Sequence, residues 1–188
     1  MRPVLIVVAL GLTLLLSPLA GRAASTGFYL RGSVGGTDLD ADIRGYRLDT
    51  IADDDSGIAY GLSAGWRFLP WLAVEAGYHD LGHFNLNCEA TPGLVCAASY
   101  TEPFRLDGFE AGLAAHVPFG DSRYYGLIRA GAHEWDLARR YGTGVDPYYG
   151  GGIGYGISQR WCLSLEFERY RTEGLDVDRI GVSVEFML

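Results

Sequence analysis

This sequence of 188 residues contains no lysine, so its 15 Lys and Arg residues are all arginines. Acidic residues number 23, so the formal net charge at pH 7 is −8. Binding to nucleic acid depends on clusters of basic side chains that neutralise phosphates. A chain with this charge balance is not expected to have nucleic acid as a partner.

Long apolar runs are equally scarce, because only the N-terminus carries one. Residues 4–16 contain no charge, Arg2 precedes them, and Gly21-Arg22-Ala23 forms a small-x-small cleavage site. This pattern predicts a secretory signal peptide over residues 1–23 and a mature domain over residues 24–188. An uncleaved anchor is less favoured, since a transmembrane helix needs about 20 apolar residues. A mature chain without such a run can cross a membrane only as a closed β-barrel.

Cysteine occurs three times. Cys88 and Cys96 lie in one polar segment, and in an oxidising compartment a disulfide between them would contribute about 2–3 kcal/mol. Metal binding is the alternative use of the pair, but their spacing matches no CxxC site. Cys162 is left unpaired in this interpretation, and no metal or cofactor is expected.

The most informative pattern is an alternation of period two over residues 58–68. One face carries Ile58, Tyr60, Leu62, Trp66 and Phe68, whereas the other is mostly glycine, alanine and serine with one charge. Such alternation predicts a strand. A soluble sheet usually covers its wet face with long charged side chains. Here the bulky face is expected to contact something extensive and apolar, and the small face to line a narrow space.

Eight segments of nine to twelve residues share this pattern: 28–36, 58–68, 71–81, 106–117, 124–135, 148–157, 161–171 and 177–188. Short connections alternate with long polar ones near residues 37–57, 82–105 and 136–147. We therefore predict an all-β fold, an eight-stranded antiparallel up-and-down transmembrane β-barrel with turns in the periplasm and loops outside. Aromatic girdles are expected near the turns, at Trp66, Phe68, Trp71, Phe119 and Trp161, and near the loops, at Tyr78, Phe109, Tyr149 and Tyr170.

A soluble lipocalin-like barrel is the alternative, since it also has eight strands and a signal peptide. Its exterior would have to be the glycine-rich face. That face is too small and carries too few charges to serve as a wet surface, so the membrane barrel is favoured.

Four stretches together resemble a known family. They are TGFYLRGSVGG at residues 26–36, WLAVEAGYHDLG at 71–82, RAGAHEWD at 129–136 and the closing GVSVEFML at 181–188. In this order they resemble the OmpA-like outer-membrane β-barrel family, and the resemblance extends over the mature chain. It implies a location in the outer membrane of a Gram-negative bacterium and a polar, charge-paired interior. It also implies insertion by the outer-membrane barrel assembly machinery and contact with outer-membrane lipid and lipopolysaccharide.

Two departures from that family affect what it implies. Its members usually end in an aromatic residue, whereas this chain ends Phe186-Met187-Leu188. The peptidoglycan-binding domain of larger members is expected to be missing, so a cell-wall tethering role is not carried over.

The candidate site is a set of charged residues that the strand alternation predicts to face the lumen. Burying such charges is costly unless they pair, and arginine's planar fork suits pairing with carboxylates. We expect a structural network, with a narrow or gated ion pathway as the alternative; a general porin is not expected, because eight strands leave room only for side chains. The set comprises Arg31, Arg67, Glu75, Glu110, Arg129, Glu166, Glu168, Arg179 and Glu185.

Histidines raise the question of enzymatic activity, since some small outer-membrane barrels modify lipid A. By the strand alternation, His116, His133 and the serines of the strands face the lumen. No strand therefore presents a serine beside a histidine to lipid. His79 and His83 are expected to lie at the rim, without a third metal ligand. We therefore expect no enzyme.

The first loop is acidic, with Asp53-Asp54-Asp55 among its residues. We interpret it as a solvated loop; a weak divalent-cation site is the alternative, although its spacing does not match an EF-hand. The expected function is an integral outer-membrane protein whose extracellular loops support envelope integrity or adhesion-type contact with host or surface ligands. A narrow ion pore is the alternative, and lipid A modification is less favoured.

Overall fold

The computed structural model describes residues 26–41, 57–88, 100–136, 143–172 and 175–188. The predicted signal peptide, Cys96 and most of the acidic first loop lie outside these residues. No helix in the described ranges is long and apolar enough to cross a membrane.

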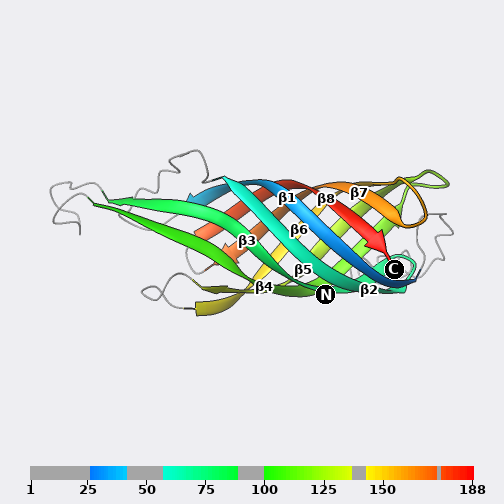
Figure 1. The fold of residues 1–188 in the computed structure, drawn as a ribbon, viewed down its shortest axis with the longest axis horizontal. Helices are drawn as coiled ribbons and strands as arrows, with labels where there is room; N and C mark the ends of the chain where they lie inside the picture. The colour runs from blue at the N-terminus through cyan, green and yellow to red at the C-terminus, as the bar shows by residue number, and fades with distance from the viewer. Residues whose placement is uncertain (1–25, 42–56, 89–99, 137–142, 173–174) are drawn as a thin grey trace, which may run out of the picture.

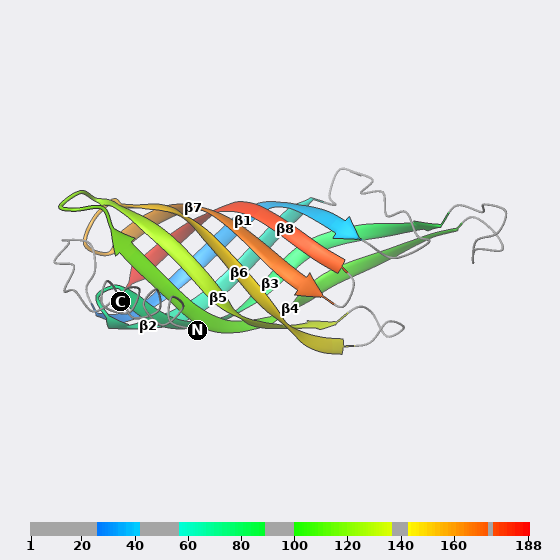
Figure 2. The ribbon, with the colours of Figure 1, turned by 180° about the vertical axis from the view of Figure 1, so that it is seen from behind.

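Eight strands form one closed sheet in which each strand pairs with its neighbours in the chain, and β1 closes the barrel against β8 (Figures 1 and 2). All the pairs are antiparallel, so the predicted eight-stranded barrel is confirmed. Closure leaves no free edge within the barrel wall. The strands are β1 (Gly27–Ala41), β2 (Ile58–Leu69), β3 (Leu72–Cys88), β4 (Tyr100–Pro118), β5 (Tyr124–Asp136), β6 (Thr143–Gly156), β7 (Trp161–Thr172) and β8 (Leu175–Met187).

The alternation in the sequence becomes the inside and outside of the wall. In β2, Leu62 is 66% exposed whereas Arg67 is 1% exposed. The polar and small side chains therefore point into the lumen, and the large apolar ones point outward. This arrangement is the reverse of a soluble protein and excludes the lipocalin-like alternative.

Strands β3 and β4 are longer than the sequence predicted. The alternation was expected to end at residue 81 and to resume at 106, but the hairpin continues from His83↔Arg105 to Cys88↔Tyr100. A register shift between Asp80 and His83 interrupts the period, and Gly82 adopts a φ of 102° there. An irregularity of this kind moves later side chains out of phase, which hid the continuation.

Aromatic rings inside the lumen lie over glycines of the wall. A Cβ at Gly154 would lie 2.0 Å from the Cζ of Tyr125, and a Cβ at Gly112 would lie 2.6 Å from the hydroxyl of Tyr148. The glycine-rich inner face is thus occupied by rings. Tyr170, predicted for the outer girdle, is also 1% exposed inside the barrel, because it alternates with outward-facing Arg169.

Candidate functional site in the lumen and at the loop end

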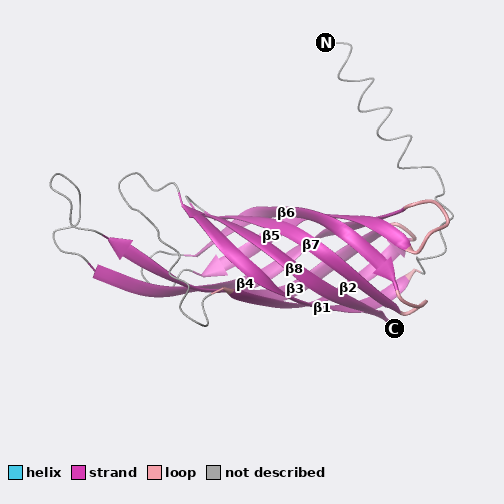
Figure 3. Ribbon diagram, turned by 90° about the horizontal axis from the view of Figure 1, so that it is seen from above, coloured by secondary structure: helices cyan, strands magenta, loops and turns pink. Residues whose placement is uncertain are grey.

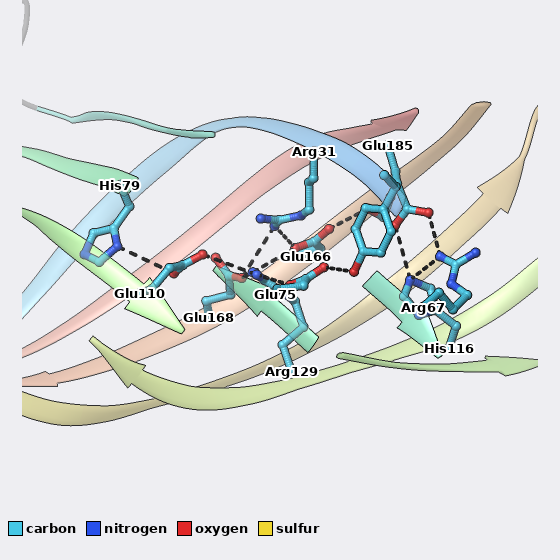
Figure 4. Close-up of polar contacts among 12 residues, drawn as sticks. Arg31, Arg67, Glu75, His79, Glu110, His116, Arg129, Glu166, Glu168 and Glu185 are labelled. Atoms are coloured by element: carbon cyan, nitrogen blue, oxygen red, sulfur yellow. Dashed lines mark hydrogen bonds and ion pairs between the residues drawn. The ribbon is translucent and has the colours of Figure 1, made fainter. Parts of the chain in front are cut away.

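All nine charged residues predicted for the lumen are buried, with exposed fractions of 7% or less. They come from seven strands, all except β6, and those labelled in Figure 4 follow one another along the barrel. The alternation within each strand predicts that each of them lies on the inner face. The contacts between them depend on closure of the barrel.

Arg129 lies at the centre of the network. Its Nε donates to Glu75 Oε2 at 2.8 Å, and its Nη2 lies 3.3 Å from Glu110 Oε1. Its Nη1 pairs with Glu168. One guanidinium from β5 therefore joins carboxylates from β3, β4 and β7, which suits the fork geometry of arginine.

Glu168 is the carboxylate with the most cationic partners. It pairs with Arg129 and Arg179, and Arg31 Nη2 lies 3.6 Å from its Oε1. The hydroxyl of Tyr170 donates to Glu168 Oε2 at 3.2 Å. Arg31 also pairs with Glu166. These contacts surround Glu168 with donors on several sides.

A second group lies closer to the short turns. Arg67 Nη2 donates to Glu185 Oε1 at 2.6 Å, and His116 Nε2 lies 3.4 Å from Glu185 Oε2. The Arg67 guanidinium also lies over the ring of Tyr29, 5.3 Å from its centroid. Tyr29 connects the two groups, because its hydroxyl donates to Glu75 Oε1 at 2.5 Å. Tyr29 lies two residues before Arg31 and shares its inner face, but the predicted set of charged residues did not include it.

The expectation that His79 lies at the rim was wrong: it is 4% exposed and its Nδ1 lies 3.5 Å from Glu110 Oε2. Its ring packs 5.6 Å from that of His133 and 4.9 Å from that of Tyr170. His79 lies within the predicted strand 71–81, on the same face as Glu75, so it points into the lumen instead of lying at the rim. His83, beyond the register shift, is exposed as expected.

The charges are enclosed by uncharged layers at both ends. Towards the loops, Leu81, Leu106, Trp135 and Val177 are buried. Towards the turns, the buried cluster comprises Tyr29, Ala73, Ala114, Tyr125, Leu127, Cys162 and Met187. Burial of these charges is costly, and the Arg–Glu contacts offset part of that cost.

Catalytic and metal-binding geometries are not found in the described part of the chain. Its His, Cys, Asp and Glu residues form no group of three suited to a metal ion. Ser164 donates to Glu166 Oε1 at 2.5 Å, and no serine hydrogen-bonds a histidine within the described residues. Cys162 is a buried free thiol, and Cys88 is the last residue of β3.

A two-stranded ribbon extends β3 and β4 beyond the barrel at the loop end (Figures 1 and 3). Pairing of β2 with β3 reaches only Asp80, and pairing of β4 with β5 reaches only Asp107. Among the described residues, 83–88 and 100–105 therefore pair only with each other. We call these twelve residues the projecting ribbon.

Comparison with known proteins identifies the fold family. The profile of the outer membrane protein beta-barrel domain matches residues 6–187. The chain belongs to this family. The predicted resemblance to OmpA-like barrels is thereby confirmed, and no curated protein sequence matches the chain.

Solved structures of outer-membrane barrels resemble this one. OprG from Pseudomonas aeruginosa shares 12% identity at a TM-score of 0.56, covering 88% of this chain and 98% of its own. Neisserial surface protein A shares 14% sequence identity at a TM-score of 0.51, and the match covers 89% of this chain and 100% of that protein's chain. The outer membrane protein AlkL shares 13% sequence identity at a TM-score of 0.52, and the match covers 90% of this chain and 95% of the AlkL chain. At these identities the likeness shows the fold.

In this outer-membrane barrel, the exposed apolar side chains form the surface expected to contact lipid. Near the turns, Phe28 and Trp66 stack at 6.2 Å between ring centroids, and Trp161 lies 4.6 Å from Phe186. Such aromatic belts occur at membrane interfaces.

Polar pairs on the outer surface mark the loop-end limit of this apolar band. Arg169 Nε donates to Asp178 Oδ1 at 2.5 Å, and Tyr78 donates to Asp107 Oδ2 at 2.5 Å. Arg105 Nε donates to Asp80 Oδ2 at 3.0 Å. The projecting ribbon begins at this level, so it lies beyond the apolar band.

Proposed function

We propose that this outer-membrane barrel is non-enzymatic and acts at the cell surface. Its projecting ribbon and the polar segments between strands make adhesion-type contacts with host or surface molecules or support the envelope. The observation that carries this proposal is the ribbon, because a strand pair beyond the wall contributes nothing to closing the barrel. The lumen network serves the stability of the wall.

The ribbon has a chemistry suited to binding polypeptide. Within the described part of the chain, each of its strands has one neighbour, so backbone N–H and C=O groups along its two outer edges have no strand partner there. Proteins commonly recognise extended peptides by adding them to such an edge. Exposed edges otherwise favour aggregation, and charges or proline usually protect them.

The two edges differ in this protection. The β4 side, residues 100–105, contains Glu102, Pro103 and Arg105, whereas residues 84–88 on the β3 side read FNLNC without charge or proline. The β3 edge is therefore the better acceptor for an incoming strand.

The remaining parts of the proposal concern export and assembly. We infer that residues 1–23 are cleaved as a signal peptide and that the barrel assembly machinery inserts the mature chain. Its apolar band then contacts outer-membrane lipid, including lipopolysaccharide. Support for this comes from the N-terminal sequence pattern and from membership of the family.

The test removes the ribbon and keeps the barrel. Joining Gly82 to Leu106 through a short glycine-asparagine turn deletes residues 83–105, and heat-modifiable migration on gels reports whether the barrel still folds. We expect the variant to reach the outer membrane but to lose binding to immobilised serum and extracellular-matrix proteins. The matched control replaces residues 137–142, between β5 and β6, with glycine and serine and should keep binding. Unchanged binding by a folded ribbon deletion would refute the surface role of the ribbon.

A further inference from the structure

Two of the short turns enclose a polar depression at the end of the barrel opposite the ribbon. The β4–β5 turn, residues 119–123, and the β6–β7 turn, residues 157–160, project side by side there (Figures 1 and 2). A hydrogen bond of 2.9 Å from Gly156 N to Arg123 O joins their bases. The depression has a volume of about 620 Å³, within the range of about 300–1,000 Å³ that is usual for ligand sites. Its lining includes Asp121, Ser122, Arg123, Ile157, Ser158 and Gln159.

The depression contains hydrogen-bond donors from both turns. Arg123 reaches across to the neighbouring turn, where its Nη1 donates to Ile157 O at 3.4 Å. That bond uses one of the five N–H groups of the guanidinium. Ser158 Oγ accepts from Arg160 N and from Trp161 N, both at 3.2 Å, so its oxygen is held in place and its own proton is left to donate. Arginine and hydroxyl donors that converge in this way suit a phosphate group.

A carboxylate lines the same depression. Asp121 belongs to the β4–β5 turn, and an ionised carboxylate can only accept hydrogen bonds. Among the described residues, neither Asp121 nor Arg123 forms an ion pair. The lining therefore presents one negative and one positive charge without net charge. A ligand that carries both an ammonium and a phosphate complements it, whereas a purely anionic ligand leaves Asp121 facing a like charge.

The depression is continuous with the apolar exterior of the barrel. Ile157 lines it and is also 51% exposed on the outer surface. Phe119 and Tyr124 of the adjacent turn are similarly exposed, and the ring of Tyr124 lies 4.9 Å from that of Tyr155. Aromatic side chains of this kind belong to the level of lipid head groups. An amphiphile can therefore place its acyl chains against the wall and its polar head between the turns.

We propose that this depression binds the phosphoethanolamine head group of a phospholipid in the leaflet on the turn side. The phosphate accepts from Arg123 and Ser158, and the primary ammonium donates to Asp121. A choline head group fits less well, because its quaternary ammonium donates no hydrogen bond and is typically held by aromatic faces, which the described lining lacks. A phosphoglycerol head group has no cation for Asp121. This site is independent of the surface role proposed for the projecting ribbon.

Native mass spectrometry of the folded protein tests this proposal. The protein is released from detergent with equal amounts of three phospholipids that share acyl chains and differ in an ethanolamine, choline or glycerol head group. We expect the ethanolamine lipid to be retained about threefold more than the others, and Arg123→Gln to remove this excess. Arg160→Gln is the matched control, since Arg160 is an exposed arginine of the β6–β7 turn outside the lining. Equal retention of the three lipids by wild type, or an unchanged excess in Arg123→Gln, would overturn the proposal.

Two further measurements test the role of Asp121 and the source of the head group. Asp121→Asn removes the acceptor for the ammonium and should raise retention of the glycerol lipid to that of the ethanolamine lipid; an unchanged preference in the folded variant would refute the pairing with Asp121. Soluble phosphoethanolamine, offered at the concentration of the lipid, should not be retained, because it lacks acyl chains to contact the wall. Its retention at the same occupancy as the lipid would refute a membrane lipid as the ligand.

Discussion

The ring of Tyr29 occupies the space above Gly65 on the inner wall, where a Cβ on Gly65 would lie 2.2 Å from the tyrosine Cζ. The ring cannot move aside freely, because its hydroxyl donates to Glu75 and the Arg67 guanidinium lies over its face. The glycine of β2 and the tyrosine of β1 thus depend on each other. This pair explains why the inner face is rich in glycine even though the lumen is full.

Gly65→Ala should therefore destabilise the barrel. Forcing a methyl group into a filled site typically costs about 1–3 kcal/mol. Unfolding in urea, followed by gel migration, should show a lower midpoint. The control is Gly32→Ala on the lipid-facing side of β1, where nothing lies within 4 Å of the new Cβ. Equal midpoints for the two variants would contradict the packing described here.

Removal of the Glu168 carboxylate should be more damaging than removal of an exposed partner. Breaking a buried ion pair from one side costs about 3–5 kcal/mol. Glu168→Ala leaves three arginines short of a partner and should lower the urea midpoint strongly. In Asp178→Ala, which breaks a partly exposed pair with Arg169, we expect a loss of about 0–1 kcal/mol. Similar losses in the two variants would argue against a structural network.

The lumen should not conduct ions. Side chains fill it, and the charges are enclosed by layers containing Leu81 and Leu106 on one side and Leu127 and Met187 on the other. Planar-bilayer recordings of wild type and of Glu75→Gln should show no discrete conductance. Steps that appear in wild type and change with Glu75→Gln would instead support the narrow pore considered from the sequence.

Thiol labelling will test the predicted Cys88–Cys96 disulfide. Folded protein should take up no alkylating reagent, because Cys162 is buried and the other two are paired. Unfolding without reductant should expose one thiol, and unfolding with reductant all three. Mass spectrometry counts the adducts, and three adducts in the unreduced, unfolded sample would exclude the disulfide.

Much of the wall could be predicted from the sequence, because alternation is a local property. Each strand's period of two determines which residues share a face, as for Leu62 and Arg67 in β2. One failure came where a local irregularity changed the phase. The shift at Gly82 hid the outer part of β3 and, with it, the origin of the projecting ribbon.

By itself, the sequence determined the class of fold, the face on which each charge lies and the apolar exterior. It could not determine which charges meet. Arg129 of β5 contacts Glu75 of β3 and Glu168 of β7, and neither of those strands is its neighbour in the sheet. Such contacts run across the lumen and exist only once β1 has paired with β8. Only the closed tertiary structure, with its register, decided the network and the tyrosine–glycine packing, because both join residues from distant parts of the chain.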